Sequence, residues 1–235
     1  MAQTRRRAGV AGPAWIGAML NLIALDGPSG VGKSTTAKRL AEALRWGHMD
    51  TGAMYRAATL AFMRAGAAPG DKAKTAEILS TFGYEQRGGA SFLNGEDVSG
   101  VIRGMDVTKN VSAVSADPAV REALVGIQQE MGAAGQWVID GRDIGTVVFP
   151  QALCKIFLVA TPEARAQRRV LELQAKGIAA EYEEVLADQA RRDHLDSTRA
   201  VSPLRKADDA VELDSSNLSI GEVVEKIIEI YKAKL

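Results

Sequence analysis

The chain has 235 residues, of which 46% are hydrophobic and 25% are charged, and both values are ordinary for a globular protein. Its 29 Lys and Arg residues balance its 29 Asp and Glu residues, and a formal net charge of zero argues against a general nucleic-acid binder. The one cysteine, Cys154, excludes an internal disulfide framework and favours a reducing, cytoplasmic compartment.

The first residues imitate a secretory signal only weakly. Three arginines precede a fairly apolar stretch, but this stretch continues into the strand that carries the first motif, so cleavage inside it would damage the fold. We therefore expect either that residues 1–19 are a disordered extension or that Met19 is the true start. No other stretch is long and apolar enough to span a membrane, so no membrane partner is expected.

The first motif is a glycine-rich loop. The run LDGPSGVGKSTT fits the pattern G-x-x-x-x-G-K-[ST], after a predicted strand at residues 20–26 and before a predicted helix at 34–45. In this context the backbone N–H groups of the loop point toward a bound anion. The predicted ATP-binding residues are Gly27, Pro28, Ser29, Gly30, Val31, Gly32, Lys33, Ser34 and Thr35.

Two side chains of this loop have their own chemistry. Lys33 supplies a point charge that follows a moving phosphoryl group, and the hydroxyl of Ser34 is a ligand for Mg²⁺. The loop therefore predicts a nucleoside triphosphate with Mg²⁺. It does not distinguish a kinase from a switch GTPase or a motor.

Strand-like and helix-like segments alternate along the rest of the chain. Further strands are predicted at residues 136–143, 154–160 and 209–214. Further helices are predicted at 53–65, 117–131, 162–176, 181–193 and 220–233. This alternation predicts a three-layer α/β fold with a mostly parallel central sheet and helices on both faces. Ligands of such sheets bind at the carboxyl ends of the strands.

Residues 67–105 break the alternation. Asn94-Gly95 lies between two short β-prone runs, which is a strong signal for a hairpin. We predict a β-rich insert at about residues 67–112, within a single domain of residues 20–235.

The helix predicted from residue 162 has a clear beginning and end. Thr161 is a suitable N-cap, Pro162 suits the first helical position, and Gly177 is a suitable terminator. A spacing of three or four residues places three arginines on one face of this helix: Arg165, Arg168 and Arg169.

Arginines elsewhere indicate a second ligand. Arg56 lies near a predicted helix start, Arg142 lies just past a buried strand, and Arg199 lies in the run RRDHLDSTRAVSPL. Arginine is the side chain best shaped to bind phosphate bidentately, so these three together predict a site for a monophosphate. Each alone is more often a surface salt-bridge partner.

The sequence resembles the bacterial cytidylate kinases, a family of P-loop nucleoside monophosphate kinases. The matching runs are DGPSGVGKST, HMDTGAMYRA, NGEDVS, VREAL, DGRDIGTVVFP and RRDHLDSTRAVSPL, in the order of the family, over about residues 20–235. The glycine loop is shared with many folds, whereas the last two runs are more specific. The resemblance implies transfer of the γ-phosphoryl of ATP to CMP or dCMP, in pyrimidine nucleotide metabolism. A monomer is the default expectation, because the sequence carries no recognisable interface signal.

The resemblance also implies roles for the matched positions. Around the α-phosphate of CMP it places Thr51, Arg56, Arg142 and Arg199. At the cytosine edge it places Ser112, Arg121 and Asp143, and at the pentose Arg192 and Asp196. Arg165, Arg168 and Arg169 fall in a lid at about residues 162–180, and with Lys33 and Arg142 they are expected to be catalytic. Asp140 either orients water on Mg²⁺ or supports the arginines. The insert is expected to close over CMP.

Hydrogen bonding supports the cytosine assignment. A carboxylate accepts from the amino group of cytosine, while Arg or Ser donates to its ring nitrogen and carbonyl. Uracil would leave Asp143 facing an oxygen, so a preference for cytosine follows.

Rival functions remain at this stage. The acceptor is alternatively another monophosphate, such as UMP or AMP, or a hydroxyl compound such as shikimate. A nucleotide-dependent switch would need a guanine motif such as N-K-x-D, which the sequence lacks. The two histidines, His48 and His194, are expected to be structural, because this type of phosphoryl transfer needs no imidazole.

Overall fold

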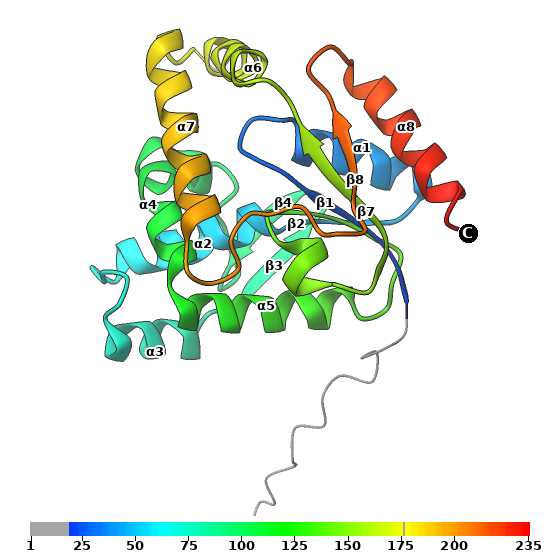
Figure 1. Ribbon diagram of the computed structural model, residues 1–235. Helices are drawn as coiled ribbons and strands as arrows, with labels where there is room; N and C mark the ends of the chain where they lie inside the picture. Colours follow the sequence, from blue (N-terminus) through cyan, green and yellow to red (C-terminus); the bar gives the residue numbers. More distant parts are fainter. Residues whose placement is uncertain (1–18, 176) are drawn as a thin grey trace, which may run out of the picture.

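A five-stranded parallel sheet forms the middle layer of this computed structural model, which describes residues 19–175 and 177–235 (Figure 1). The order across the sheet is β2-β6-β1-β7-β8. The strands are β1 (Leu20–Asp26), β2 (Gly47–Asp50), β6 (Trp137–Asp140), β7 (Ala152–Val159) and β8 (Val211–Asp214). The expected parallel sheet is confirmed. The extension predicted at residues 1–19 lies, apart from Met19, outside the described residues.

Helices cover both faces of the sheet. They are α1 (Lys33–Leu44), α2 (Thr51–Arg64), α3 (Lys72–Ser80), α4 (Met105–Ala116), α5 (Pro118–Gly132), α6 (Pro162–Ala175), α7 (Tyr182–Thr198) and α8 (Ile220–Lys232). Side chains of β1 alternate between the two faces: Ile23 and Leu25 pack with α1 and α8, whereas Leu22 and Ala24 pack on the opposite face, toward α5. A strand covered on both faces needs a continuous apolar run, which the sequence supplies.

The strand β2 was missing from the sequence prediction. Its run GHMD has only one apolar side chain, Met49, and so lacks the apolar run typical of a buried strand. Its pairing with β6 aligns Gly47 with Trp137 and Asp50 with Asp140. A side chain at Gly47 would come within 2.5 Å of the Trp137 ring, so the pairing needs glycine at this position. This strand is therefore specified by a partner about ninety residues away.

The insert contains helices as well as strands. The predicted hairpin is confirmed, with β4 (Ala90–Leu93) turning through Asn94 and Gly95 at φ values of 51° and 85°. The remaining elements of the small antiparallel sheet are β3 (Tyr84–Arg87) and β5 (Glu96–Asp97), and a 3₁₀ turn follows at Val101–Arg103.

The helices α3 and α4 correct the expectation that the insert is mainly β. The run of α4 is rich in Val, Thr and Ser, which favour strands or turns more than helices. However, Val107, Val111 and Val114 are buried at helical spacing against α2. Packing in the folded protein therefore overrides local propensity here.

The start and end of α6 are as expected. The helix begins at Pro162, and the hydroxyl of Thr161 accepts a hydrogen bond from the N–H of Ala164 at 3.2 Å. Gly177 has a φ of 71°, a left-handed conformation typical of helix ends. No helix within the described residues is long and apolar enough to cross a membrane.

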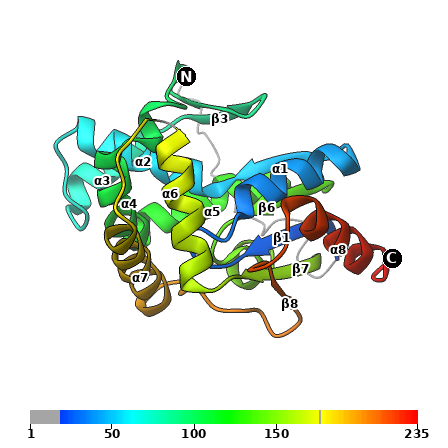
Figure 2. The ribbon, with the colours of Figure 1, turned by 90° about the horizontal axis from the view of Figure 1, so that it is seen from above.

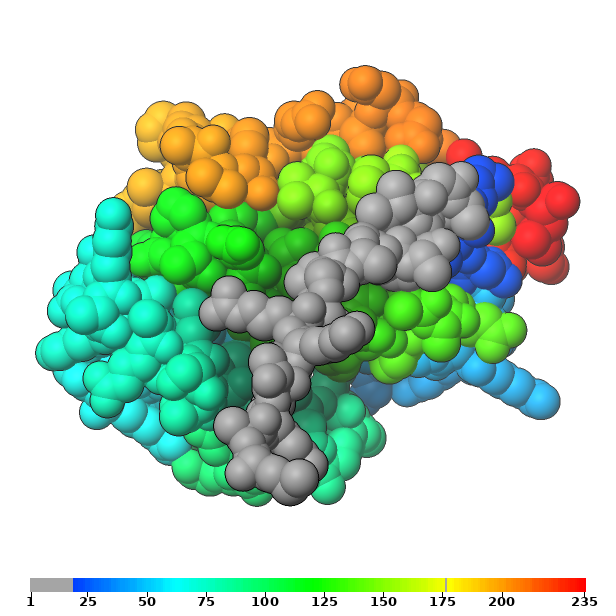
Figure 3. Space-filling model, turned by 90° about the horizontal axis from the view of Figure 1, so that it is seen from below, coloured from blue at the N-terminus to red at the C-terminus, as the bar shows by residue number. Residues whose placement is uncertain are grey.

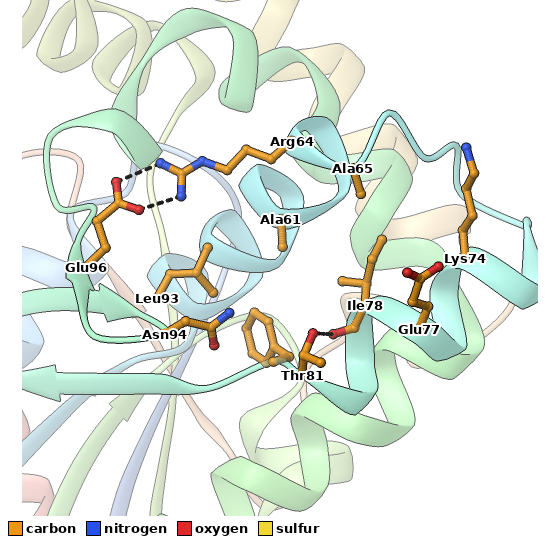
Figure 4. Close-up of a pocket in the computed structure, with 11 residues that line it drawn as sticks. Ala61, Arg64, Ala65, Lys74, Glu77, Ile78, Thr81, Leu93, Asn94 and Glu96 are labelled. Carbon is orange, nitrogen blue, oxygen red and sulfur yellow. Dashed lines mark hydrogen bonds and ion pairs between the residues drawn. The ribbon is translucent and has the colours of Figure 1, made fainter.

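One hollow lies on the outside of the insert, and none of the predicted site residues lines it. It has a volume of about 520 Å³. It lies between α2, α3 and the β4–β5 turn, and Arg64 and Glu96 form a two-bond ion pair on its rim (Figure 4). The helices α6 and α7 lie on the side of the insert, at the end of the molecule opposite α8 (Figure 2). In Figure 3 the insert (cyan) and α7 (orange-yellow) likewise lie at the end opposite α8 (red).

Candidate active site

Three aspartates mark the edge of the sheet where the site lies. Asp26, Asp50 and Asp140 are the last residues of β1, β2 and β6, and all three are buried. The glycine loop leaves the sheet directly after Asp26, and its backbone fits only glycine at two points. A side chain at Gly27 would lie 2.1 Å from the carbonyl oxygen of Leu158, and Gly32 has a φ of 91° where α1 begins.

The lysine of the loop is buried among its own carbonyl groups. The Nζ of Lys33 donates to the carbonyl oxygens of Gly27 at 2.7 Å and Pro28 at 2.6 Å. Burial, followed by the nearby charge of Arg142, lowers the pKa of Lys33 well below its ordinary value. An anion in the loop would offset both effects.

Ser34 lies next to a carboxylate from the neighbouring strand. Its hydroxyl donates to Oδ2 of Asp140 at 2.6 Å, and the backbone carbonyl of Asp140 accepts from the hydroxyl of Thr51 at 2.7 Å. Thr51 is the first residue of α2, so the sheet edge and this helix are joined at Asp140. Thr35, the last predicted loop residue, is exposed.

A group of arginines lies next to this edge. Arg56 on α2 donates to the carbonyl of Ile102 at 3.0 Å and to the hydroxyl of Thr108 at 2.8 Å. Burial, followed by the charge of Arg192, lowers the pKa of Arg56 to about 10. Burial also lowers the pKa of Arg192, and the charge of Arg142 adds to the effect. These cations are close enough to one another to be mutually unfavourable.

Asp143 forms the negative centre of the other wall. It is buried, pairs through Oδ2 with Arg121 of α5, and accepts from Arg199 at 3.4 Å through Oδ1. Arg121 also donates to the carbonyl of Ser115 at 3.2 Å, in α4, the helix that carries Ser112. The structure therefore brings Arg121 and Asp143, two of the three predicted base-reading residues, together, and it places Ser112 on α4 one turn before Ser115.

Arg142 and Asp196 connect that wall to α7. The Nε of Arg142 donates to Oδ2 of Asp196 at 2.8 Å. Burial opposes the charge of Arg142, but the nearby carboxylates of Asp196, Asp193 and Asp140 together outweigh it and raise the pKa of Arg142. Arg192 and Asp196 lie one turn apart on α7, and Arg199 directly follows the helix, as the spacing predicts.

The protein-family model described as Cytidylate kinase matches residues 23–233, nearly the whole described chain. The chain belongs to the cytidylate kinase family. A cytidylate kinase of Mycolicibacterium paratuberculosis is 50% identical over 218 residues, which cover 91% of this chain and 96% of the relative. A cytidylate kinase of Rhodococcus jostii is 51% identical over 212 residues, with 88% and 93% covered. One of Anoxybacillus flavithermus is 48% identical over 217 residues, with 91% and 96% covered.

The three predicted lid arginines of this cytidylate kinase family member have different surroundings. Arg165 is buried and donates to the carbonyl of Ser29 at 2.9 Å, and Arg168 donates to the carbonyls of Ser215 and Ser216 beyond β8. Arg169 pairs with Glu172 at 2.8 Å, and its positive charge contributes to lowering the pKa values of Arg56 and Arg192. The three arginines are spaced to share one face of α6, but each of them contacts different partners.

Two charged residues of the site were missed by the sequence reasoning. Arg103 ends the 3₁₀ turn of the insert and donates to Asp50 at 3.2 Å, beside Arg56. Asp193 on α7 pairs with Arg165 and accepts from the backbone N–H of Ser29 at 2.9 Å. Asp193 lies inside the run RRDHLDSTRAVSPL, which was already singled out, whereas no sequence signal marks Arg103.

Proposed function

We propose that this member of the cytidylate kinase family transfers the γ-phosphoryl of ATP to CMP or dCMP, giving ADP and CDP or dCDP. The observation that carries the proposal is the group of partly buried arginines beside the glycine loop. Burial lowers the pKa values of Arg56 and Arg192, and the buried Nε of Arg192 has no hydrogen-bond partner within the described residues. Arg56 donates to a backbone carbonyl and a hydroxyl rather than to a carboxylate. Removing such cations from water costs free energy, and a dianionic phosphate would offset that cost.

The position of this group next to the loop supports a phosphate acceptor over a hydroxyl acceptor. A hydroxyl acceptor would need a base to remove its proton, whereas a phosphate oxygen is already ionised near neutral pH. In the proposal Arg56, Arg142 and Arg199 bind the α-phosphate of CMP together with Thr51. Arg192 and Asp196 contact the pentose.

The wall around Asp143 supports cytosine as the base. Each carboxylate oxygen accepts two hydrogen bonds, so Asp143 is able to bind Arg121 and Arg199 and still accept from an exocyclic amino group. Ser112 and Arg121 supply donors for the acceptors of the ring. Uracil would place an oxygen against this buried carboxylate.

The proposed transfer is an in-line displacement. An α-phosphate oxygen of CMP forms a bond to the γ-phosphorus as the bond to the bridging β,γ-oxygen breaks, and ADP leaves with that oxygen. Lys33 exchanges its contacts with the loop carbonyls for phosphate oxygens, and Arg142 and Arg169 stabilise the charge of the transferring group. Arg165 and Arg168 hold the lid helix to the loop and to the segment after β8.

The residues present fit a bound Mg²⁺. The hydroxyl of Ser34 is a hard oxygen ligand at the end of the glycine loop, and the carboxylate of Asp140 lies behind it and accepts its hydrogen. The described residues contain no cluster of three or more His, Cys, Asp or Glu side chains able to hold a metal, so the nucleotide phosphates would supply the other ligands. Bound there, the ion would neutralise phosphate charge and orient the β- and γ-oxygens.

We further propose that the segment at about 67–112 closes over CMP and that about 162–180 is a lid, in one domain of residues 20–235 with residues 1–19 as an extension. The helix α4, at the end of the insert, contacts α7, the helix that follows the lid segment. Closure would exclude water and suppress hydrolysis of ATP. We expect a cytoplasmic monomer.

A coupled assay of ADP release tests the proposal. The protein is supplied with Mg-ATP and with each of CMP, dCMP, UMP, AMP and GMP in turn. We expect strong turnover with CMP and dCMP and weak turnover with UMP. Fast turnover with UMP would leave the phosphoryl-transfer site standing and overturn the assignment of Asp143, whereas turnover indifferent to every monophosphate would overturn the kinase proposal.

A further inference from the structure

His48 is joined to the glycine loop through one carboxylate. Its Nε2 lies 2.8 Å from Oδ1 of Asp140, and Oδ2 of the same carboxylate accepts from the hydroxyl of Ser34 at 2.6 Å. The three side chains come from β2, β6 and the start of α1, so the sheet edge lines them up. Asp140 is buried, whereas His48 is only partly so.

The direction of each hydrogen bond follows from the chemistry of the groups. An ionised carboxylate only accepts, so Nε2 of His48 carries the hydrogen and the hydroxyl of Ser34 donates its own. A hydroxyl that donates to a carboxylate keeps its lone pairs free, and the carboxylate increases its electron density. Both effects favour Ser34 as a ligand for a cation.

The contact with His48 restricts the rotation of Asp140. Its backbone carbonyl accepts from Thr51 at 2.7 Å, but that bond leaves the carboxylate free to turn about its own axis. The bond to Nε2 fixes Oδ1, and Oδ2 then faces Ser34. Without His48, Oδ1 would need another donor, and the carboxylate would no longer be held against the loop.

We propose that His48 is a positioning residue for the Mg²⁺–ATP complex and acts through Asp140 on Ser34. This inference rests on the proposed function, and it replaces the expectation that His48 is only structural. His48 does not touch the substrate in this arrangement. Its loss should weaken the contribution of Mg²⁺ to ATP binding, because only the ligand at Ser34 depends on it.

The test measures ATP binding by titration calorimetry, without CMP, in excess Mg²⁺ and in excess EDTA. The ratio of the two dissociation constants is the gain in affinity that Mg²⁺ provides. We expect His48→Leu to reduce this gain by about threefold to tenfold, less than the roughly 10–100-fold typical of residues that contact a metal ligand directly. The KM for CMP should be unchanged, and affinity in EDTA should equal that of the wild type.

Two further variants make the result specific. His48→Gln keeps a donor able to reach Asp140, and it should restore part of the gain. His194→Leu removes the other histidine of the chain, which lies exposed on α7, and should behave as the wild type. A thermal melt of each variant confirms that it is folded.

The outcomes separate this inference from the proposed function. An unchanged gain in folded His48→Leu would overturn the role of His48 and leave the kinase proposal intact. Equal weakening in Mg²⁺ and in EDTA would also overturn it, because that is the result of a merely structural change. A wild type that binds no ATP, or gains nothing from Mg²⁺, would count against the proposed function itself.

Discussion

The carboxylate of Asp193 on α7 accepts a hydrogen bond of 2.9 Å from the backbone N–H of Ser29 in the glycine loop. The same carboxylate pairs with Arg165 on α6, and Arg165 donates to the carbonyl of Ser29 at 2.9 Å. The lid helix α6 and the helix α7 that follows it are therefore both attached to one loop residue by charge-assisted hydrogen bonds, which are stronger than neutral ones.

Asp193→Asn should loosen this attachment. We expect the free energy of unfolding to fall by about 1–3 kcal/mol, because hydrogen bonds to a charged group are lost and buried Arg165 loses its counterion. The KM for ATP should rise several-fold, while the KM for CMP changes less. Urea unfolding and steady-state kinetics measure the two effects.

Asp188→Asn is the matched control on the same helix. Asp188 pairs with Arg191 at 2.5 Å, but both side chains are about half exposed, so the pair contributes at most about 1 kcal/mol. Equal effects of the two variants on the KM for ATP would contradict a specific role for Asp193.

Asp143→Asn should change the choice of base. The amide has nearly the shape of the carboxylate but presents an NH₂ group, which suits the carbonyl of uracil. We expect the ratio of kcat/KM for CMP over UMP to fall by at least about tenfold. Measuring kcat/KM for both monophosphates gives the ratio directly.

Asp196→Asn tests whether any lost carboxylate has this effect. Asp196 is also buried and pairs with Arg142, but it lies on the wall assigned to the pentose. Its loss should lower kcat/KM for CMP and UMP by similar factors and leave their ratio unchanged. A change of the ratio in both variants would mean that Asp143 does not read the base.

The central sheet could be predicted because the sequences of its long strands are by themselves typical of buried strands. The apolar runs of β1 and β7 need burial on both faces, and the glycine loop fixes which end of the sheet holds the ligand. The short strand β2 and the helix α4 could not be predicted in the same way. Their conformation depends on Trp137 of β6 and on packing against α2, which no local pattern reveals.

The same difference between local signals and contacts made by the fold applies to the site. Motifs predicted the glycine loop and most of the arginines, because residue type and spacing indicate what each side chain is able to bind. The contact of Ser29 with Asp193 joins residues 164 positions apart, and that of His48 with Asp140 joins residues 92 positions apart. Only the fold brings these pairs together. The sequence therefore indicated the residues proposed to contact ATP and CMP better than the residues that hold those side chains in place.

Arg103→Gln should weaken binding of the acceptor. Arg103 brings a further positive charge from the insert to the arginines around Arg56, and its own pair with Asp50 is more than half exposed on the arginine side. We therefore expect a stability change below about 1 kcal/mol. The KM for CMP should rise by up to about tenfold, since the proposed phosphate site loses one of the positive charges that attract the anion.

Arg64→Gln provides the comparison within the insert. Arg64 pairs with Glu96 at 2.6 Å on the rim of the outer hollow, away from the site (Figure 4). Arg64→Gln should leave the KM for ATP and the KM for CMP as in the wild type. An equal rise of the KM for CMP in the two variants would show a general effect of charge on the insert rather than a contact with substrate.

Asp26 should make stability depend on pH in an unusual direction. Its carboxylate accepts from the N–H groups of Ile144 at 2.8 Å and Gly145 at 2.7 Å, which begin the π-helical turn Ile144–Val148. Burial nevertheless raises the pKa of Asp26 from 3.8 to about 6, against the effect of these hydrogen bonds. The folded protein therefore binds this proton more tightly than the unfolded chain does.

The sign of the effect follows from proton linkage. Below about pH 4 both states are protonated at Asp26, and its contribution to stability is fully present. As the pH rises through about 6 the contribution is lost, and its size is roughly 3 kcal/mol for a shift of this magnitude. The variant Asp26→Asn isolates this contribution, because an amide does not titrate. We expect the unfolding free energy of the wild type, minus that of Asp26→Asn, to fall between about pH 4 and about pH 6 and to level off above that interval. Urea unfolding at a series of pH values measures the difference, in which the exposed carboxylates common to both proteins cancel. Parallel profiles for the two proteins would mean that the pKa of Asp26 is the same in the folded and the unfolded state.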